Sequence, residues 1–276
     1  MRRAEQTDVG ETSAFVSGDA AVLLEVEELT ARLRHENNRV RSLREYVIAR
    51  LKRIGMGAEW FEVLAGVSFS VAGGELLAVV GPNGAGKTSL LRVLAGIIPP
   101  FAGRVCVNGR VAPLIELGAG FDPELTGREN VYLYGSILGL GSGEMVSLYG
   151  SIVDFAGLNG AMDTAVRNYS SGMIARLGFS IATCARPQIL LVDEVLAVGD
   201  EEFRGRCFER IDQLRRRGGA VVLVTHDLAL VEATAGQAIY LDHGRVLASG
   251  DPSSVVAAYR QATVGVAGTS VGVAAL

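Results

Sequence analysis

Residues 81–88 read Gly81-Pro82-Asn83-Gly84-Ala85-Gly86-Lys87-Thr88 and fit the pattern G-x-x-x-x-G-K-[ST]. The apolar run from Glu75 to Val80 predicts a buried strand before them, and a helix is predicted from Lys87 to about Ala95. Glycines at these spacings let successive backbone N–H groups point at one anion, and the helix start adds the positive end of its dipole. Motif and context agree, so they predict a phosphate-binding loop and disfavour a Gly-rich turn before an ordinary helix.

The end of this loop carries side chains suited to a nucleoside triphosphate. Lys87 is predicted to reach the β- and γ-phosphates, and the Thr88 hydroxyl is predicted to bind Mg²⁺. We assign the nucleotide contacts of the loop to residues 81–88 and the adjoining Ser89. The predicted cofactors are therefore ATP and Mg²⁺.

Two adjacent acids follow another buried strand. Ile189 to Val192 are all apolar, and Asp193 and Glu194 come directly after them. Ligands of open α/β sheets bind beyond the carboxyl ends of the strands. Asp193 is therefore predicted to hold Mg²⁺, and Glu194 to orient or deprotonate the attacking water. The alternative, that both acids only face solvent, is the weaker one beside a phosphate loop in the same chain.

A small-residue motif, Tyr169-Ser170-Ser171-Gly172-Met173, stands at the start of another predicted helix. Ser170 can cap that helix, and Gly172 leaves room for an anion. Taken alone, such a motif is usually only a cap. Further along, His226 follows the apolar strand that ends at Thr225, so its side chain is expected at the ligand-binding edge of the sheet.

The rest of the chain alternates helical and strand patterns. Apolar spacing predicts helices over 128–138, 143–156, 172–184 and 201–216, and strands over 21–27, 62–71, 189–192 and 220–225. Several of the strands are apolar throughout rather than alternating. Such strands, separated by helices, indicate a parallel sheet that is covered on both faces.

Together the motifs resemble the nucleotide-binding subunit of an ATP-binding cassette (ABC) transporter over residues 21–261. In that family 81–88 is the Walker A loop, 170–173 the signature and 189–193 the Walker B strand, followed by a D-loop that ends at Asp200 and by the switch histidine, His226. The resemblance implies an α/β fold with three parts. They are a P-loop NTPase core with a parallel sheet, an antiparallel β subdomain, and a helical subdomain over about 118–185 that carries the signature.

The resemblance also implies a homodimer. In this family the signature of one subunit closes over ATP held by the Walker A loop of its partner. Ser170, Ser171, Gly172 and Met173 would therefore bind ATP in trans, with Asp200 as a further contact. Lys87, Glu194 and His226 form the implied catalytic set, with the histidine bonded to the γ-phosphate. ATP binding would close the dimer and hydrolysis would reopen it.

Several details resemble the branch that exports lipid-linked polysaccharide, such as O-antigen, teichoic acid or galactan. They are the Tyr-Ser-Ser-Gly-Met signature, the run Asp193-Glu194-Val195-Leu196-Ala197-Val198-Gly199-Asp200, and Leu117-Gly118-Ala119-Gly120-Phe121 ahead of Leu125-Thr126-Gly127-Arg128-Glu129-Asn130. This resemblance implies a peripheral ATPase dimer at the cytoplasmic face of the cell membrane. It would be bound to two copies of a separate membrane-spanning permease that passes the glycolipid.

Two positions depart from the family pattern. Glu116 stands where most members have a glutamine that binds Mg²⁺, and its carboxylate could supply an oxygen ligand. Leu33 replaces the aromatic residue that usually stacks on adenine, which leaves Trp60, Phe61 and Tyr46 as candidates. Of these we assign Trp60 to the nucleotide, although an aromatic residue beside a strand more often packs in the core.

The ends of the chain and one insertion differ in composition from the cassette. Residues 1–20 predict a flexible tail, and 262–276 form a Gly- and Ala-rich C-terminal tail. The insertion 36–60 contains a basic amphipathic helix predicted from Glu36 to Ile54. This helix either packs on the domain or lies at the membrane surface against anionic lipid, and the sequence leaves both readings open.

Composition excludes several other classes of protein. Thirty acidic and 26 basic residues give a net charge of −4, which offers no global footprint for nucleic acid. No apolar run approaches the roughly 20 residues of a membrane span, and the first residues lack the apolar stretch of a signal peptide. We therefore expect a cytoplasmic protein. Its three cysteines, Cys106, Cys184 and Cys207, lack metal-ligand spacing and predict buried thiols.

Two other functions compete with transport. One is a soluble ABC-type ATPase that acts on nucleic acid or ribosomes, but the long coiled coil or second cassette that would support it is not visible. The other is a nucleotide-binding regulatory module without turnover, which the presence of Glu194 disfavours. The prediction is therefore the ATP-hydrolysing subunit of a polysaccharide exporter.

Overall fold

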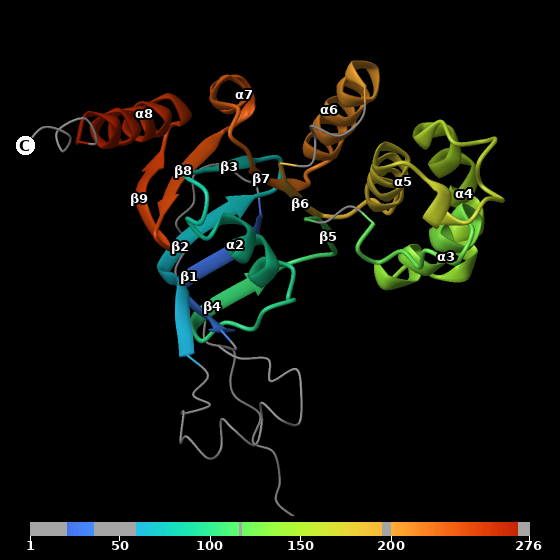
Figure 1. Cartoon of the computed structure of the whole chain (residues 1–276), viewed down its shortest axis with the longest axis horizontal. Helices are drawn as coiled ribbons and strands as arrows, with labels where there is room; N and C mark the ends of the chain where they lie inside the picture. The colour runs from blue at the N-terminus through green and yellow to red at the C-terminus, as the bar shows by residue number, and fades with distance from the viewer. Residues whose placement is uncertain (1–20, 36–58, 116–117, 195–199, 270–276) are drawn as a thin grey trace, which may run out of the picture.

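The computed structural model describes residues 21–35, 59–115, 118–194 and 200–269, and Figure 1 shows two sheets with helices around them. The larger sheet has the strand order β5-β6-β7-β3-β8-β9. Its strands are β3 (Leu76–Val80), β5 (Val111–Leu114), β6 (Ile189–Asp193), β7 (Ala220–Val224), β8 (Gln237–Asp242) and β9 (Arg245–Gly250). All run parallel except β9, which is antiparallel to β8. The neighbours β6, β7 and β3 therefore end at one edge of the sheet.

The smaller sheet is antiparallel and has the order β2-β1-β4. It comprises β1 (Val22–His35), β2 (Glu59–Ala72) and β4 (Ala102–Val107). Its apolar face, helix α2 (Lys87–Leu94) and one face of the large sheet share a buried core. Leu77 and Val79 of β3 point into this core, whereas Leu76, Ala78 and Val80 point into a second core on the other face. Because both faces are buried, these strands are apolar at every position.

The second core continues into a helical subdomain, which lies to one side of the sheets in Figure 1. Its helices are α3 (Gly127–Ile137), α4 (Ser142–Ala156) and α5 (Ser171–Cys184), with a short 3₁₀ turn, η1 (Val166–Asn168), before α5. Thr126 and Glu129 form a capping box that fixes the start of α3. The chain then returns through α6 (Glu201–Arg216), α7 (Leu228–Thr234) and α8 (Pro252–Thr269).

The structure confirms the predicted α/β fold, and most predicted elements differ from the observed ones by only a few residues at either end. Two elements are longer than expected. The strand predicted over 21–27 continues to His35, because β1 pairs with β2 along its whole length through several register shifts. The tail boundary drawn at 262 falls inside α8, which continues to Thr269 although this stretch contains two glycines and four β-branched residues.

Three predictions fall outside the described residues. They are the flexible tail 1–20, the basic amphipathic helix from Glu36 to Ile54, and the last part of the C-terminal tail, 270–276. Within the described ranges, no helix is long and apolar enough to cross a membrane.

Candidate functional site

The Gly-rich loop joins β3 to α2, and two of its glycines are required by close backbone contacts. Gly81 has φ +153°, and a Cβ there would stand 2.0 Å from the Leu241 carbonyl oxygen. Gly86 has φ +105°, and its Cβ would stand 2.6 Å from the Val63 carbonyl oxygen. Real Cβ atoms do not approach backbone oxygens so closely, so only glycine lets the loop pack against β2 and β8 in this conformation.

We expect Gly81→Ala to lower the free energy of unfolding by roughly 3 kcal/mol or more, because the new methyl group meets fixed backbone. Gly84→Ala is the matched control, since Gly84 also has a positive φ, +81°, but has nothing within 4 Å of its Cβ position. The control should cost only about 1 kcal/mol. Urea unfolding without nucleotide measures both values, and equal losses would show that the contact with Leu241 is not what requires glycine.

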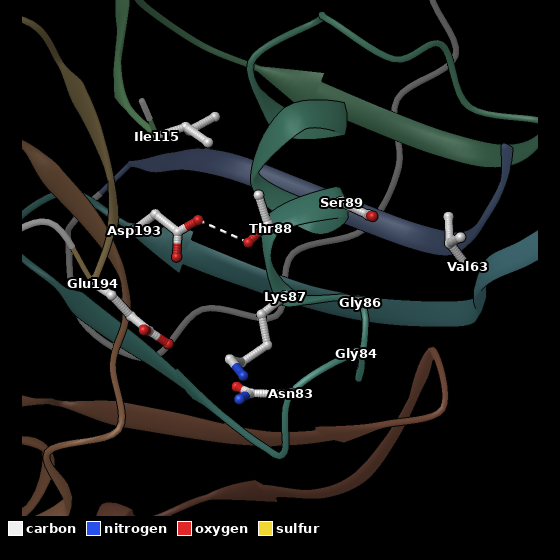
Figure 2. A pocket seen from close by; sticks show the side chains of 10 residues that line it. All are labelled: Val63, Asn83, Gly84, Gly86, Lys87, Thr88, Ser89, Ile115, Asp193 and Glu194. Atoms are coloured by element: carbon white, nitrogen blue, oxygen red, sulfur yellow. Dashed lines mark hydrogen bonds between the residues drawn. The ribbon is translucent and has the colours of Figure 1, made fainter. Parts of the chain in front are cut away.

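A cavity of about 420 Å³ opens beside the loop, at the edge where β3 and β6 end (Figure 2). The residues that line it are Val63, Asn83, Gly84, Gly86, Lys87, Thr88, Ser89, Ile115, Asp193 and Glu194. The structure therefore brings the predicted phosphate loop and both predicted acids, about 105 residues apart in the chain, into one site.

Lys87 is nearly buried, with 7% of its surface exposed. Its Nζ donates hydrogen bonds to the carbonyl oxygens of Gly81 at 2.8 Å and Pro82 at 2.9 Å. Burial lowers the pKa of the Lys87 ammonium, although Glu194 and Asp193 oppose that shift. A phosphate anion in the cavity would favour the charged form of this ammonium, so the site is suited to an anionic ligand.

Thr88 and Asp193 form the part of the cavity suited to a metal ion. The Thr88 hydroxyl donates a hydrogen bond to Asp193 Oδ2 at 2.8 Å. Burial raises the pKa of the Asp193 carboxyl, partly opposed by this hydrogen bond. Within the described ranges, no group of three or more His, Cys, Asp or Glu side chains could hold a metal ion alone. One carboxylate and one hydroxyl fit Mg²⁺, which commonly takes its other ligands from nucleotide phosphates and water.

Glu194 lines the cavity, and His226, which is not among the lining residues, contacts it. The His226 Nε2 atom is 2.6 Å from Glu194 Oε1, and both side chains are partly exposed. The pairing of β6 with β7 brings them together, because the Glu194 N–H donates to the Val224 carbonyl oxygen at 3.0 Å. The Glu194 carboxylate thus shares the cavity with Lys87 and Asp193, where it could orient water toward a bound phosphate, and the imidazole contacts this carboxylate.

The ABC transporter family model matches residues 64–197. The chain is 42% identical to the O-antigen export system ATP-binding protein RfbB of Klebsiella pneumoniae over 196 residues, which cover 71% of this chain and 80% of RfbB. The chain belongs to the ABC transporter family. As an ABC ATPase it binds and hydrolyses ATP.

Other relatives of this ABC ATPase are longer, and the matched region covers a smaller share of their length. It is 42% identical to the ABC transporter protein AbcA of Aeromonas salmonicida, with 73% of this chain and 65% of AbcA covered. It is 36% identical to the teichoic acids export ATP-binding protein TagH of Listeria innocua, with 72% of this chain and 59% of TagH covered. The chain thus spans less than two thirds of the length of these two relatives.

Solved structures agree with the ABC fold. The structure of an ATP-binding subunit of an ABC transporter aligns with this chain at a TM-score of 0.67 and 24% identity. The alignment covers 83% of this chain and 90% of that subunit. A dimeric ATP-binding cassette in a post-hydrolysis state, bound to ADP and Pi, has a TM-score of 0.66 at 20% identity, over 83% of this chain and 98% of that chain. At these identities the likeness supports the fold alone.

The predicted signature residues, 170–173, lie at the N-terminus of α5. Ser170 is the N-cap, and its Oγ accepts a hydrogen bond from the Met173 N–H at 3.2 Å. Ser171 and Gly172 form the first turn of the helix. None of the four lines the cavity beside the Gly-rich loop in the same chain. The structure therefore brings together one half of the predicted nucleotide site and keeps the other half apart.

Asp200 is also placed away from the cavity. It is the N-cap of α6, accepts a hydrogen bond from the Phe203 N–H at 2.8 Å, and pairs with Arg176 of α5. The hydrogen bond from Phe203 lowers the pKa of the Asp200 carboxyl. In this chain Asp200 thus links the signature helix to α6, and its predicted contact with nucleotide stays a prediction.

The two departures from the family pattern have different outcomes. Trp60 is 62% exposed near the start of β2 and does not line the cavity, so the structure does not bring it to the nucleotide loop. Glu116 lies outside the described residues, but Ile115 immediately before it lines the cavity.

Sequence reasoning missed two of the residues that line the cavity, Ile115 and Val63. Val63 is skipped in the pairing of β1 with β2, where Ala31 faces Leu64 and Arg32 faces Glu62. Such a bulge aims a side chain out of the regular alternation. The only available signal for Ile115 was its position directly before Glu116.

Proposed function

We propose that this ABC ATPase is the energy-supplying subunit of a transporter that exports a lipid-linked polysaccharide across the cytoplasmic membrane. Its ATPase chemistry is inferred from the arrangement of Lys87, Thr88, Asp193 and Glu194 around one cavity, with His226 Nε2 2.6 Å from Glu194 Oε1. The proposed role in export is based on the names of the relatives, since RfbB is an O-antigen export ATP-binding protein and TagH is a teichoic acids export ATP-binding protein.

In this proposal the side chains at the cavity have separate roles in the hydrolysis of the terminal phosphate of ATP. Lys87 turns from the loop carbonyls to the β- and γ-phosphate oxygens and stabilises the charge that develops there. Thr88 and Asp193 would hold Mg²⁺, which neutralises phosphate charge when bound. Glu194 accepts the proton of the attacking water, and His226 positions the Glu194 carboxylate through their contact at 2.6 Å.

The signature motif of a second copy completes the site. The N-terminus of α5 is absent from the cavity of its own chain, yet its N–H groups and Ser170 form a feature that binds anions. A closed homodimer would place this helix start against the γ-phosphate held by the partner. The dimeric neighbour with ADP and Pi supports this arrangement.

A separate membrane-spanning permease, in two copies, would receive the motion of the dimer. This proposal rests on the exporter names of the relatives, and it locates the dimer peripherally at the cytoplasmic face of the membrane. The net charge of −4 gives no support to the alternative of a nucleic-acid partner. Binding of the nucleotide without turnover is disfavoured because the chain has Glu194, with His226 2.6 Å from it.

Depletion of the protein in its own organism tests the export function. We expect lipid-linked polysaccharide to accumulate on the cytoplasmic side and to disappear from the cell surface. Expression of the wild-type chain should restore export, whereas Lys87→Ala should not, because it cannot bind the phosphates. Surface labelling of the glycan measures export in the depleted cells and after expression of each chain. Unchanged export after depletion would contradict the proposal while leaving the ATPase assignment intact.

A further inference from the structure

A second cavity, of about 390 Å³, lies at the end of the large sheet opposite the nucleotide loop. Its walls come from α4, from the C-terminal ends of α5 and α6, and from the turns that lead into β6 and β7. Its lining shares no residue with the ATP cavity. It is therefore a separate hollow in the same subunit, and its volume falls in the range of small-molecule sites.

The side chains that line this cavity are positively charged, whereas the net charge of the whole chain is negative. Three arginines line it, Arg186, Arg210 and Arg217, and its lining includes no Asp or Glu. The chain as a whole carries a net charge of −4. Such a local concentration of positive charge raises the local concentration of anions.

These guanidinium groups are not neutralised by carboxylates within the described part of the chain. Arg210 takes part in no ion pair within the described ranges; it donates to the Cys184 sulfur at 4.0 Å, and its guanidinium carbon lies 4.8 Å from the centroid of the Phe155 ring. The neighbouring arginines of α6 differ, since Arg216 pairs with Asp212 and Arg215 donates to backbone carbonyls. Arg210 of α6 and Arg217, which follows the last residue of α6, both line the cavity.

Arg186 occupies a backbone conformation that its side chain does not favour. It follows the end of α5 with φ +48°, a left-handed position at which glycine or asparagine is usual. Arg186 and Arg210 both act electrostatically on the Cys184 thiol, so the two cations converge on one region. A strained arginine beside a second unpaired one suggests a role beyond helix termination.

We propose that this cavity binds a small organic phosphate, with its phosphate or diphosphate group on Arg186, Arg210 and Arg217. Guanidinium groups suit phosphate because their planar N–H forks bond two oxygens at once. Leu148 and Leu214 give the cavity an apolar wall that can cover the organic part of the ligand. This inference is independent of the exported substrate.

Isothermal titration calorimetry on the full chain tests the site, with the nucleotide loop first saturated by AMP-PNP and Mg²⁺. The probes are glucose 1-phosphate, inorganic phosphate and glucose. We expect glucose 1-phosphate to bind most tightly, inorganic phosphate more weakly, and glucose not at all. Equal affinity for the two phosphates would overturn the organic part of the proposal, and binding of neither at millimolar concentration would overturn all of it.

Two variants locate the binding. Arg186→Gly combined with Arg217→Ala should weaken binding of glucose 1-phosphate by about tenfold or more, since two charged contacts are lost. Arg186→Gly alone should weaken binding while leaving Tm at or above that of the parent, because glycine relieves the left-handed backbone. Arg204→Ala is the matched control, an exposed arginine of α6 outside the cavity, and should bind normally. Unchanged affinity in the double variant would overturn the proposal.

Discussion

Glu194→Gln should reduce ATP turnover by roughly 10²–10⁴-fold while leaving ATP binding intact. Glutamine keeps the shape of the side chain but cannot accept the proton of the attacking water. Lys87, Thr88 and Asp193 are unchanged, so the phosphates and the proposed metal ion keep their ligands. Because the proposed homodimer would reopen only after hydrolysis, this variant should accumulate as an ATP-bound dimer. Phosphate release and size-exclusion chromatography with light scattering measure the two effects.

Glu201→Gln is the matched control for this variant. Glu201 is an exposed acid at the start of α6 and does not line the ATP cavity. It should hydrolyse ATP at the parental rate and should not be trapped as a dimer. Full activity in Glu194→Gln would refute the role of Glu194 as general base, and loss of ATP binding in that variant would show that the carboxylate instead serves the nucleotide.

The ATP cavity could be predicted from sequence because each of its parts is local. The Gly-rich loop, the acids after β6 and the histidine after β7 each follow a buried strand, and the parallel order of the sheet brings these strand ends together. The site therefore follows from the predicted strands and helices and from the rule that ligands bind at the carboxyl ends of parallel strands. The contact of Glu194 with His226 at 2.6 Å is a result of that register.

Other features could not be predicted because they depend on distant packing. The bulge that turns Val63 into the cavity is set by the pairing of β1 with β2, and nothing in the residues around it departs from a strand pattern. The assignment of Trp60 to the nucleotide stays a prediction, because it used residue type and could not tell which side chains of β2 reach the cavity. The three arginines of the second cavity come from two separate segments, and only the fold brings them together.

Mixing two inactive variants should restore ATP hydrolysis if the site is shared between subunits. Lys87→Ala lacks a phosphate contact and Ser170→Arg blocks the signature, so each homodimer has two defective sites. In a mixed dimer, the Walker A loop of the Ser170→Arg chain meets the signature of the Lys87→Ala chain, which gives one intact site. Random exchange makes half of the dimers mixed, so about a quarter of all sites should be intact.

The ATPase rate of the mixture, measured after subunit exchange and compared with each variant alone, reports this recovery. A chain that carries both substitutions is the control, because mixing it with either single variant cannot create an intact site. A rate as low as that of the separate variants, with exchange shown by differently labelled chains, would place Ser170 and Lys87 in the same subunit's site. The structure argues against that outcome, since the N-terminus of α5 does not line the cavity that Lys87 occupies.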